Sequence, residues 1–168
     1  MKILYLIIWL LVVNAFQGVL GVFISDKLTI DLTLIAVVIY SIHYKEEAGT
    51  VIGFFFGLFQ DGLSGGVFGI NTICKTIVGF FVGKISGRLI LESFITHFLV
   101  VFCSSILEGI IAFLVVVIFE IMPIPKLSGN LLPSAFFNGI LGVVIFQIIR
   151  LIRSRFSKEA MLPRKYYD

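Results

Sequence analysis

The sequence has little charge. Asp, Glu, Lys and Arg together make up 14% of its residues, whereas a soluble domain carries about 25%. Apolar residues make up 59%, against roughly 45–50% in soluble proteins, and the mean hydropathy is +1.11. This balance excludes an ordinary soluble domain and places the chain among membrane proteins.

Residues that carry catalysis or bind metals are also scarce. The two cysteines, Cys74 and Cys103, form no Cys-x-x-Cys pair and have no histidine at ligand spacing, so we expect them to be packing residues. The sequence has no HExxH motif, no Ser–His or Ser–Lys pair at a plausible spacing and no paired aspartates on facing segments. We therefore expect no enzyme activity, no metal and no cofactor.

Apolar segments separated by polar or glycine-rich breaks fill most of the chain. A bilayer crossing needs about 20 apolar residues, so six crossings leave no room within the chain for a separate soluble domain. We predict an all-α polytopic membrane protein with a six-helix transmembrane domain over residues 1–151 and a basic cytoplasmic tail over residues 152–168. The predicted spans cover residues 3–24, 28–42, 48–63, 69–86, 93–121 and 132–151.

Basic residues predict the orientation, because Lys and Arg accumulate in cytoplasmic loops. With the N-terminus in the cytoplasm, ten of the 13 basic residues lie inside, only Lys27 and Lys126 lie outside, and Lys75 lies within a span. An even number of spans, with both termini cytoplasmic, fits this bias. The C-terminal basic cluster has no folded module around it, so we expect it to meet the lipid bilayer and not nucleic acid.

A polar, glycine-rich break interrupts the apolar segments at residues 61–71, which read Asp-Gly-Leu-Ser-Gly-Gly-Val-Phe-Gly-Ile-Asn. A carboxylate at the end of an apolar helix is costly in lipid. We expect Asp61 to order the break by accepting hydrogen bonds from backbone N–H groups near Ser64 and Gly65, as aspartate does in turns.

Glycines recur at four-residue spacing on both sides of this break. The two rows are Gly49, Gly53 and Gly57 before it, and Gly79, Gly83 and Gly87 after it. Such rows form a groove in which a second backbone can approach closely. They predict tight packing within one bundle, and the alternative is a docking face for a partner's transmembrane helix.

Lys75 and Glu108 are ionisable residues inside predicted spans, where such residues usually face the bundle interior. Three interpretations compete: a structural polar lock of Lys75, Asp61 and Glu108; a transport site in which Glu108 or Asp61 binds a proton, cation or solute; and catalysis. We favour the lock, because Glu108 needs either a partner or a proton at this depth.

The length, the six segments, Asp31 at the start of the second segment and the unit around the break resemble the rod shape-determining MreD family. Ile70 stands where the family commonly has Leu, and Ile30 stands where a proline often precedes the aspartate. The motif resemblance covers about residues 49–87. Its positions are Gly53, Gly57, Asp61, Ser64, Gly65, Gly69, Asn71, Gly79 and Gly83.

This resemblance implies a non-enzymatic scaffold of the cell-wall elongation machinery in the bacterial cytoplasmic membrane, involved in cell shape. The implied partners are a bitopic MreC-like protein and, through it, the MreB filament, RodA and a class B penicillin-binding protein. The family is similar in fold to the S-components of energy-coupling-factor vitamin transporters, so we expect an S-component-like bundle. A substrate-binding S-component is the alternative function. It would need a polar and aromatic cavity near the outer side, whereas this chain has one tryptophan, Trp9.

Overall fold

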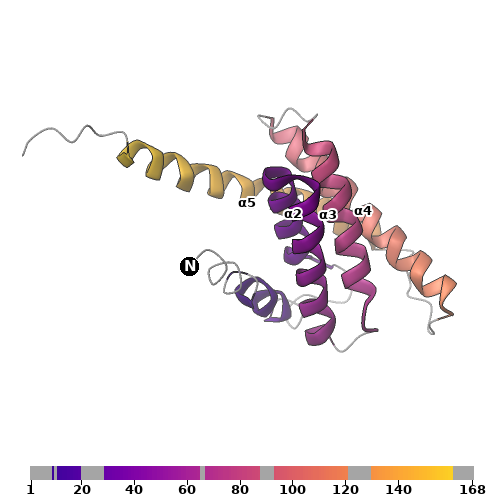
Figure 1. Ribbon diagram of the computed structural model, residues 1–168. Helices are drawn as coiled ribbons and strands as arrows, with labels where there is room; N and C mark the ends of the chain where they lie inside the picture. Colours follow the sequence, from indigo (N-terminus) through magenta and orange to yellow (C-terminus); the bar gives the residue numbers. More distant parts are fainter. Residues whose placement is uncertain are drawn as a thin grey trace, which may run out of the picture.

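The computed structural model is helical throughout its regular elements within the described residues (Figure 1). These are residues 9, 11–19, 29–64, 67–87, 93–120 and 130–160, with side chains described up to 152. Residues 11–19 are helical. The labelled helices are α2 (Leu32–Ser64), α3 (Ile70–Ser86), α4 (Phe94–Ile118) and α5 (Leu131–Ala160).

Helix α2 folds back on itself at a single residue, Lys45, whose φ of 67° and ψ of −169° are not helical. Its first half (residues 32–44) and second half (residues 46–64) run antiparallel. Thr33 Oγ1 lies 2.7 Å from Gln60 Oε1, and a Cβ built on Gly49 would lie 2.5 Å from Ser41 Oγ. The sequence predicted a loop over residues 43–47; the reversal is shorter because Lys45 adopts a left-handed φ, which is uncommon outside glycine.

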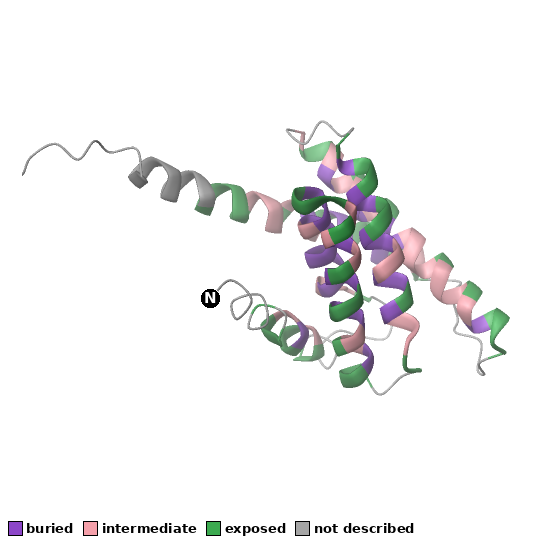
Figure 2. Ribbon diagram, viewed as in Figure 1, coloured by how far each residue is buried: buried purple, intermediate pink, exposed green. Residues whose placement is uncertain are grey.

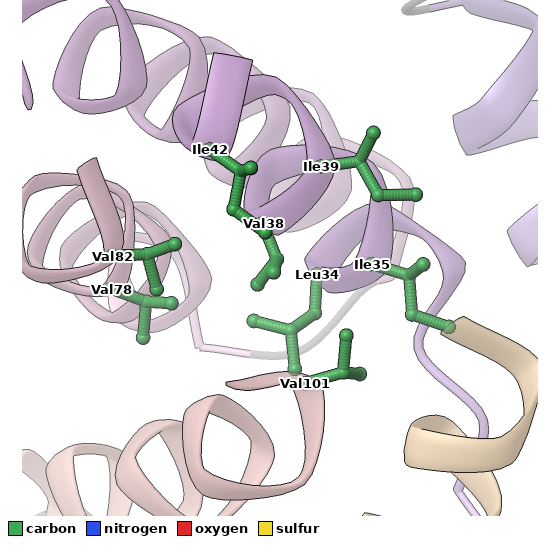
Figure 3. Close-up of a cluster of buried hydrophobic side chains, with 8 residues drawn as sticks. All are labelled: Leu34, Ile35, Val38, Ile39, Ile42, Val78, Val82 and Val101. Atoms are coloured by element: carbon green, nitrogen blue, oxygen red, sulfur yellow. The ribbon is translucent and has the colours of Figure 1, made fainter. Parts of the chain in front are cut away.

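The core lies where α2, α3 and α4 meet. Figure 2 shows the buried residues gathered on the facing sides of these helices. In the first half of α2, apolar residues recur every three or four positions and so form one continuous stripe. Figure 3 shows this stripe against side chains of α3 and α4; the cluster comprises Leu34, Ile35, Val38, Ile39, Ile42, Val78, Val82 and Val101. A smaller cluster consists of Ala36, Val37, Ile52 and Phe56.

Two of the described segments, Phe94–Ile118 and Leu131–Ile152, are long and apolar enough to cross a membrane, with mean hydropathies of 2.6 and 2.0. Helix α3, with 17 residues, is shorter than these. The C-terminal part of α5 extends away from the other helices (Figure 1). Within its described residues the chain is thus all-helical with two candidate spans, whereas six crossings and cytoplasmic termini stay predictions.

Candidate functional site

Lys75 is fully buried and pairs with two carboxylates from other parts of the chain. Its Nζ lies 2.8 Å from Asp31 Oδ2 and 2.5 Å from Glu108 Oε1. Asp31 immediately precedes α2, Lys75 belongs to α3 and Glu108 belongs to α4. Removing one partner from a buried ion pair costs about 3–5 kcal/mol, because the other charge stays buried. This ion triad therefore makes the packing of three helices depend on one ammonium group.

The two carboxylates of the ion triad differ in how many hydrogen bonds they accept. Asp31 Oδ1 accepts from Thr33 Oγ1 at 2.5 Å and from the Leu34 backbone N–H at 2.8 Å, so Asp31 also caps the start of α2. Among the described residues Glu108 accepts only from Lys75. One lysine faces two carboxylates, so neutralising either leaves a balanced pair, and neutralising Glu108 disturbs the fewest other hydrogen bonds.

The turn that carries Asp31 is tied to the helical residues 11–19 by Gln17. The amide Nε2 of Gln17 donates to the Ile30 carbonyl at 2.7 Å, and its Oε1 accepts from the Leu32 backbone N–H at 2.8 Å. One side chain thus satisfies a backbone acceptor and a backbone donor at the start of α2, where a helix leaves N–H groups without internal partners.

Helix α5 holds the same turn from another side. Asn138 Oδ1 accepts from the Asp31 backbone N–H at 3.0 Å, while Asn138 Nδ2 donates to Ser105 Oγ of α4 at 3.0 Å. Ser134 Oγ accepts from the backbone N–H and the hydroxyl of Thr29, both at 3.0 Å. The polar groups around Asp31 therefore connect α2, α4 and α5.

Asp61 caps α3 from the end of α2. Its carboxylate accepts from the backbone N–H groups of Gly69, Asn71 and Thr72, each at 3.0 Å. It also accepts from Asn71 Nδ2 at 2.9 Å and from Thr72 Oγ1 at 2.6 Å. A negative charge at a helix N-terminus is stabilised both by these donors and by the helix dipole. Gly69 enters α3 with a φ of 101°, a conformation that favours glycine.

The sequence predicted the hydrogen-bond partners of Asp61 near Ser64 and Gly65, and the donors that the structure describes are Gly69, Asn71 and Thr72. The donors lie across the break, on the first turn of α3, because the end of α2 and the start of α3 are adjacent. Ser64 Oγ donates to the Asp61 carbonyl at 3.4 Å, and Gly65 lies outside the described residues.

Five of the six glycines of the two rows lie in the contact between the second half of α2 and α3, whereas a Cβ on Gly87 would meet nothing within 4 Å. A Cβ on Gly49 or Gly79 would collide with the backbone carbonyl of the other residue, and a Cβ on Gly53 would collide with the Lys75 carbonyl. A Cβ on Gly57 would lie 2.5 Å from the Asn71 carbonyl oxygen, and one on Gly83 would lie 2.5 Å from the Glu46 backbone nitrogen. The antiparallel backbones thus touch along their whole shared length.

The membership of the predicted polar lock also needs correction. The sequence grouped Lys75, Asp61 and Glu108, but the structure pairs Lys75 with Glu108 and Asp31, while Asp61 belongs to the separate cap of α3. Asp31 was noted only for its position at the start of a span. The signal that could have identified Asp31 is its depth in the membrane. Two helices that start at the same membrane face place residues near their starts at similar depths, and Asp31 and Lys75 both lie near the start of a helix.

The two cysteines are free and differ in environment. Cys74 is buried in α3, as expected for a packing residue, whereas Cys103 on α4 is exposed. The packing prediction is therefore wrong for Cys103. Thiols behave as small apolar groups, so Cys103 adds to the apolar outer surface of α4.

One cavity has a polar lining. It has a volume of about 310 Å³ and lies between helical residues 11–19 and the end of α2. The pocket expected of an S-component would combine polar and aromatic groups, but the described residues that line this cavity include no aromatic side chain. They are Asn14, Gln17, Gly18, Gln60, Leu63 and Ser64.

Helices that expose apolar side chains outward and bury ionisable groups between them define a helical membrane protein. The family model of the rod shape-determining protein MreD matches residues 1–154. The chain therefore belongs to the MreD family, which comprises non-enzymatic proteins that determine cell shape. Neither a curated protein nor a solved structure gives a significant match to the chain.

Proposed function

We propose that this chain is an integral-membrane scaffold of the bacterial cell-wall elongation machinery. It spans the cytoplasmic membrane six times, with both termini in the cytoplasm. It binds an MreC-like bitopic membrane protein and, through it, the MreB filament, RodA and a class B penicillin-binding protein. The family match over residues 1–154 carries this proposal.

The arrangement of the buried polar groups supports a structural role for them. Lys75 forms ion pairs with Asp31 and Glu108, and the Asp61 carboxylate accepts hydrogen bonds from donors at the start of α3. Groups that satisfy one another hold helices in register and leave little capacity for a transported ion or solute. This supports the polar lock over the transport interpretation.

The outer surface supports an integral membrane protein whose helices face lipid or other membrane helices. Helices α4 and α5 expose large apolar side chains, and about a fifth of each candidate span is buried, 22% in both cases. In lipid, helices associate by packing their surfaces. The exposed side chains include Ile95, Leu99, Leu114, Phe136, Ile140 and Ile148.

Affinity purification of the tagged protein from bacterial membranes in mild detergent, followed by mass spectrometry, tests the proposal. We expect an MreC-like bitopic protein and wall synthases among the bound proteins, and we expect rod-shaped cells to round up when the protein is depleted. Recovery of paired ATPases with a coupling membrane subunit would overturn the scaffold proposal in favour of vitamin uptake.

A further inference from the structure

The polar-lined cavity between helical residues 11–19 and the end of α2 has the size of a ligand site. Its volume of about 310 Å³ falls at the lower end of the roughly 300–1,000 Å³ typical of ligand pockets. Four of its six described lining residues carry polar side chains, so the space suits water or a polar ligand.

The lining selects for an uncharged partner. It presents the amides of Asn14, Gln17 and Gln60 and the hydroxyl of Ser64, and no charged side chain is among the described lining residues. A phosphate or carboxylate would find no cation among these described residues, and an unpaired charge is costly to desolvate. Amides both donate and accept hydrogen bonds, which matches groups that do the same, namely hydroxyls and other amides.

Two of the amides are held in place and still have bonding capacity. Gln17 uses one N–H and one oxygen lone pair on the turn before α2, and Gln60 accepts from Thr33 and donates to Asp31 at 3.5 Å. An amide has two N–H donors and two acceptor lone pairs, so the hydrogen bonds among the described residues leave each of the two glutamines one of each. Groups fixed before binding lose little freedom when a ligand arrives.

We propose that this cavity binds an uncharged, hydroxyl- or amide-bearing group of the sugar type. Asn14, Gln17 and Gly18 share one face of their helix at positions i, i+3 and i+4 and form one wall, while Gln60, Leu63 and Ser64 form the other. With the orientation predicted from the basic residues, the cavity lies toward the outer face of the membrane. Its ligand is then the headgroup of an uncharged glycolipid or a free sugar.

Two glycines provide a matched pair of variants. A Cβ on Gly18 meets nothing within 4 Å, and the same holds for Gly62. Both residues are helical and exposed, but only Gly18 lines the cavity. Gly18→Leu therefore adds an apolar side chain at the cavity wall with no clash at its Cβ, and Gly62→Leu makes the same change outside the cavity. Gly18→Val is a smaller filling variant, to be used if Gly18→Leu fails to fold.

The experiment uses the purified full chain in phosphatidylglycerol nanodiscs with and without monoglucosyl diacylglycerol. Native mass spectrometry measures the bound glycolipid, and free glucose and free N-acetylglucosamine are added as competitors. We expect wild type and Gly62→Leu to bind alike, and Gly18→Leu to bind about tenfold more weakly or worse. Displacement by a free sugar identifies a soluble ligand, and retention of the glycolipid identifies a headgroup.

Two results would overturn the proposal. One is equal binding by Gly18→Leu and wild type, which would place the sugar elsewhere. The other is that wild type binds none of the uncharged probes, which would mean that the cavity holds only water. Because no partner protein is present, neither result bears on the scaffold proposal, whose test is co-purification from membranes.

Discussion

Gly49 and Gly79 lie back to back, and the backbone carbonyl of each occupies the space that a Cβ on the other would need. The second half of α2 and α3 are consequently in backbone contact at this point, with no side chain between them. Such contact brings the end of α2 close enough to the start of α3 for Asp61 to cap it.

Gly79→Ala should destabilise the folded protein by about 1–3 kcal/mol, because the added methyl group forces two backbones apart. The measurement is the midpoint of thermal unfolding in detergent. Gly62→Ala is the control: its Cβ meets nothing within 4 Å, and alanine is favoured over glycine in a helix by about 0.5–1 kcal/mol. Equal midpoints for the two variants would contradict the close packing.

Gly57→Leu and Gly83→Leu should lower the amount of MreC-like protein that co-purifies. Leucine at either position collides with the backbone of the facing segment, so the surface formed by α2 and α3 would be distorted. Pull-down from membranes followed by quantitative mass spectrometry measures this, with Gly62→Leu as the control. Unchanged recovery of the partner would show that this interface does not support docking.

Lys75→Met should be the most damaging change in the ion triad, with a loss of about 3–5 kcal/mol, because it leaves Asp31 and Glu108 buried without their cation. Glu108→Gln should be mild, since one lysine then faces one carboxylate, and adding it to Lys75→Met should restore part of the stability. The yield of monodisperse protein in size-exclusion chromatography reports each effect.

The stability of Asp31→Asn should lie between the stabilities of Glu108→Gln and Lys75→Met, because Asp31 also caps α2. A Glu108→Gln protein as unstable as Lys75→Met would refute this order. It would show that the fold requires the negative charge of Glu108.

Asp61→Ala should destabilise the junction of α2 and α3 by about 2 kcal/mol or more, because it leaves the donors of the first turn of α3 without their acceptor. Asp61→Asn should keep part of the stability, since asparagine is also a good capping residue. Protein level and cell shape in a strain that depends on the variant provide the measurement. Normal values of both for Asp61→Ala would remove Asp61 from any role in ordering the break.

Much of the secondary structure was predictable from local patterns. Apolar runs predicted helices close to the observed α3, α4 and the two halves of α2, and the glycine-rich break correctly separates α2 from α3. The reversal at Lys45 was not predictable, because a left-handed lysine has no local sequence signal. Its conformation coincides with the reversal between the two halves of α2.

The sequence by itself determined that the chain is a helical membrane protein with a polar break and two glycine rows, since composition and spacing are local properties. Only the tertiary structure decided which groups meet. Lys75 pairs with Asp31, 44 positions away, and with Glu108, 33 positions away, while Asp61 serves the cap of α3. Spacing along a helix defines the face on which a charge lies, but its partner depends on which helix covers that face and at what depth.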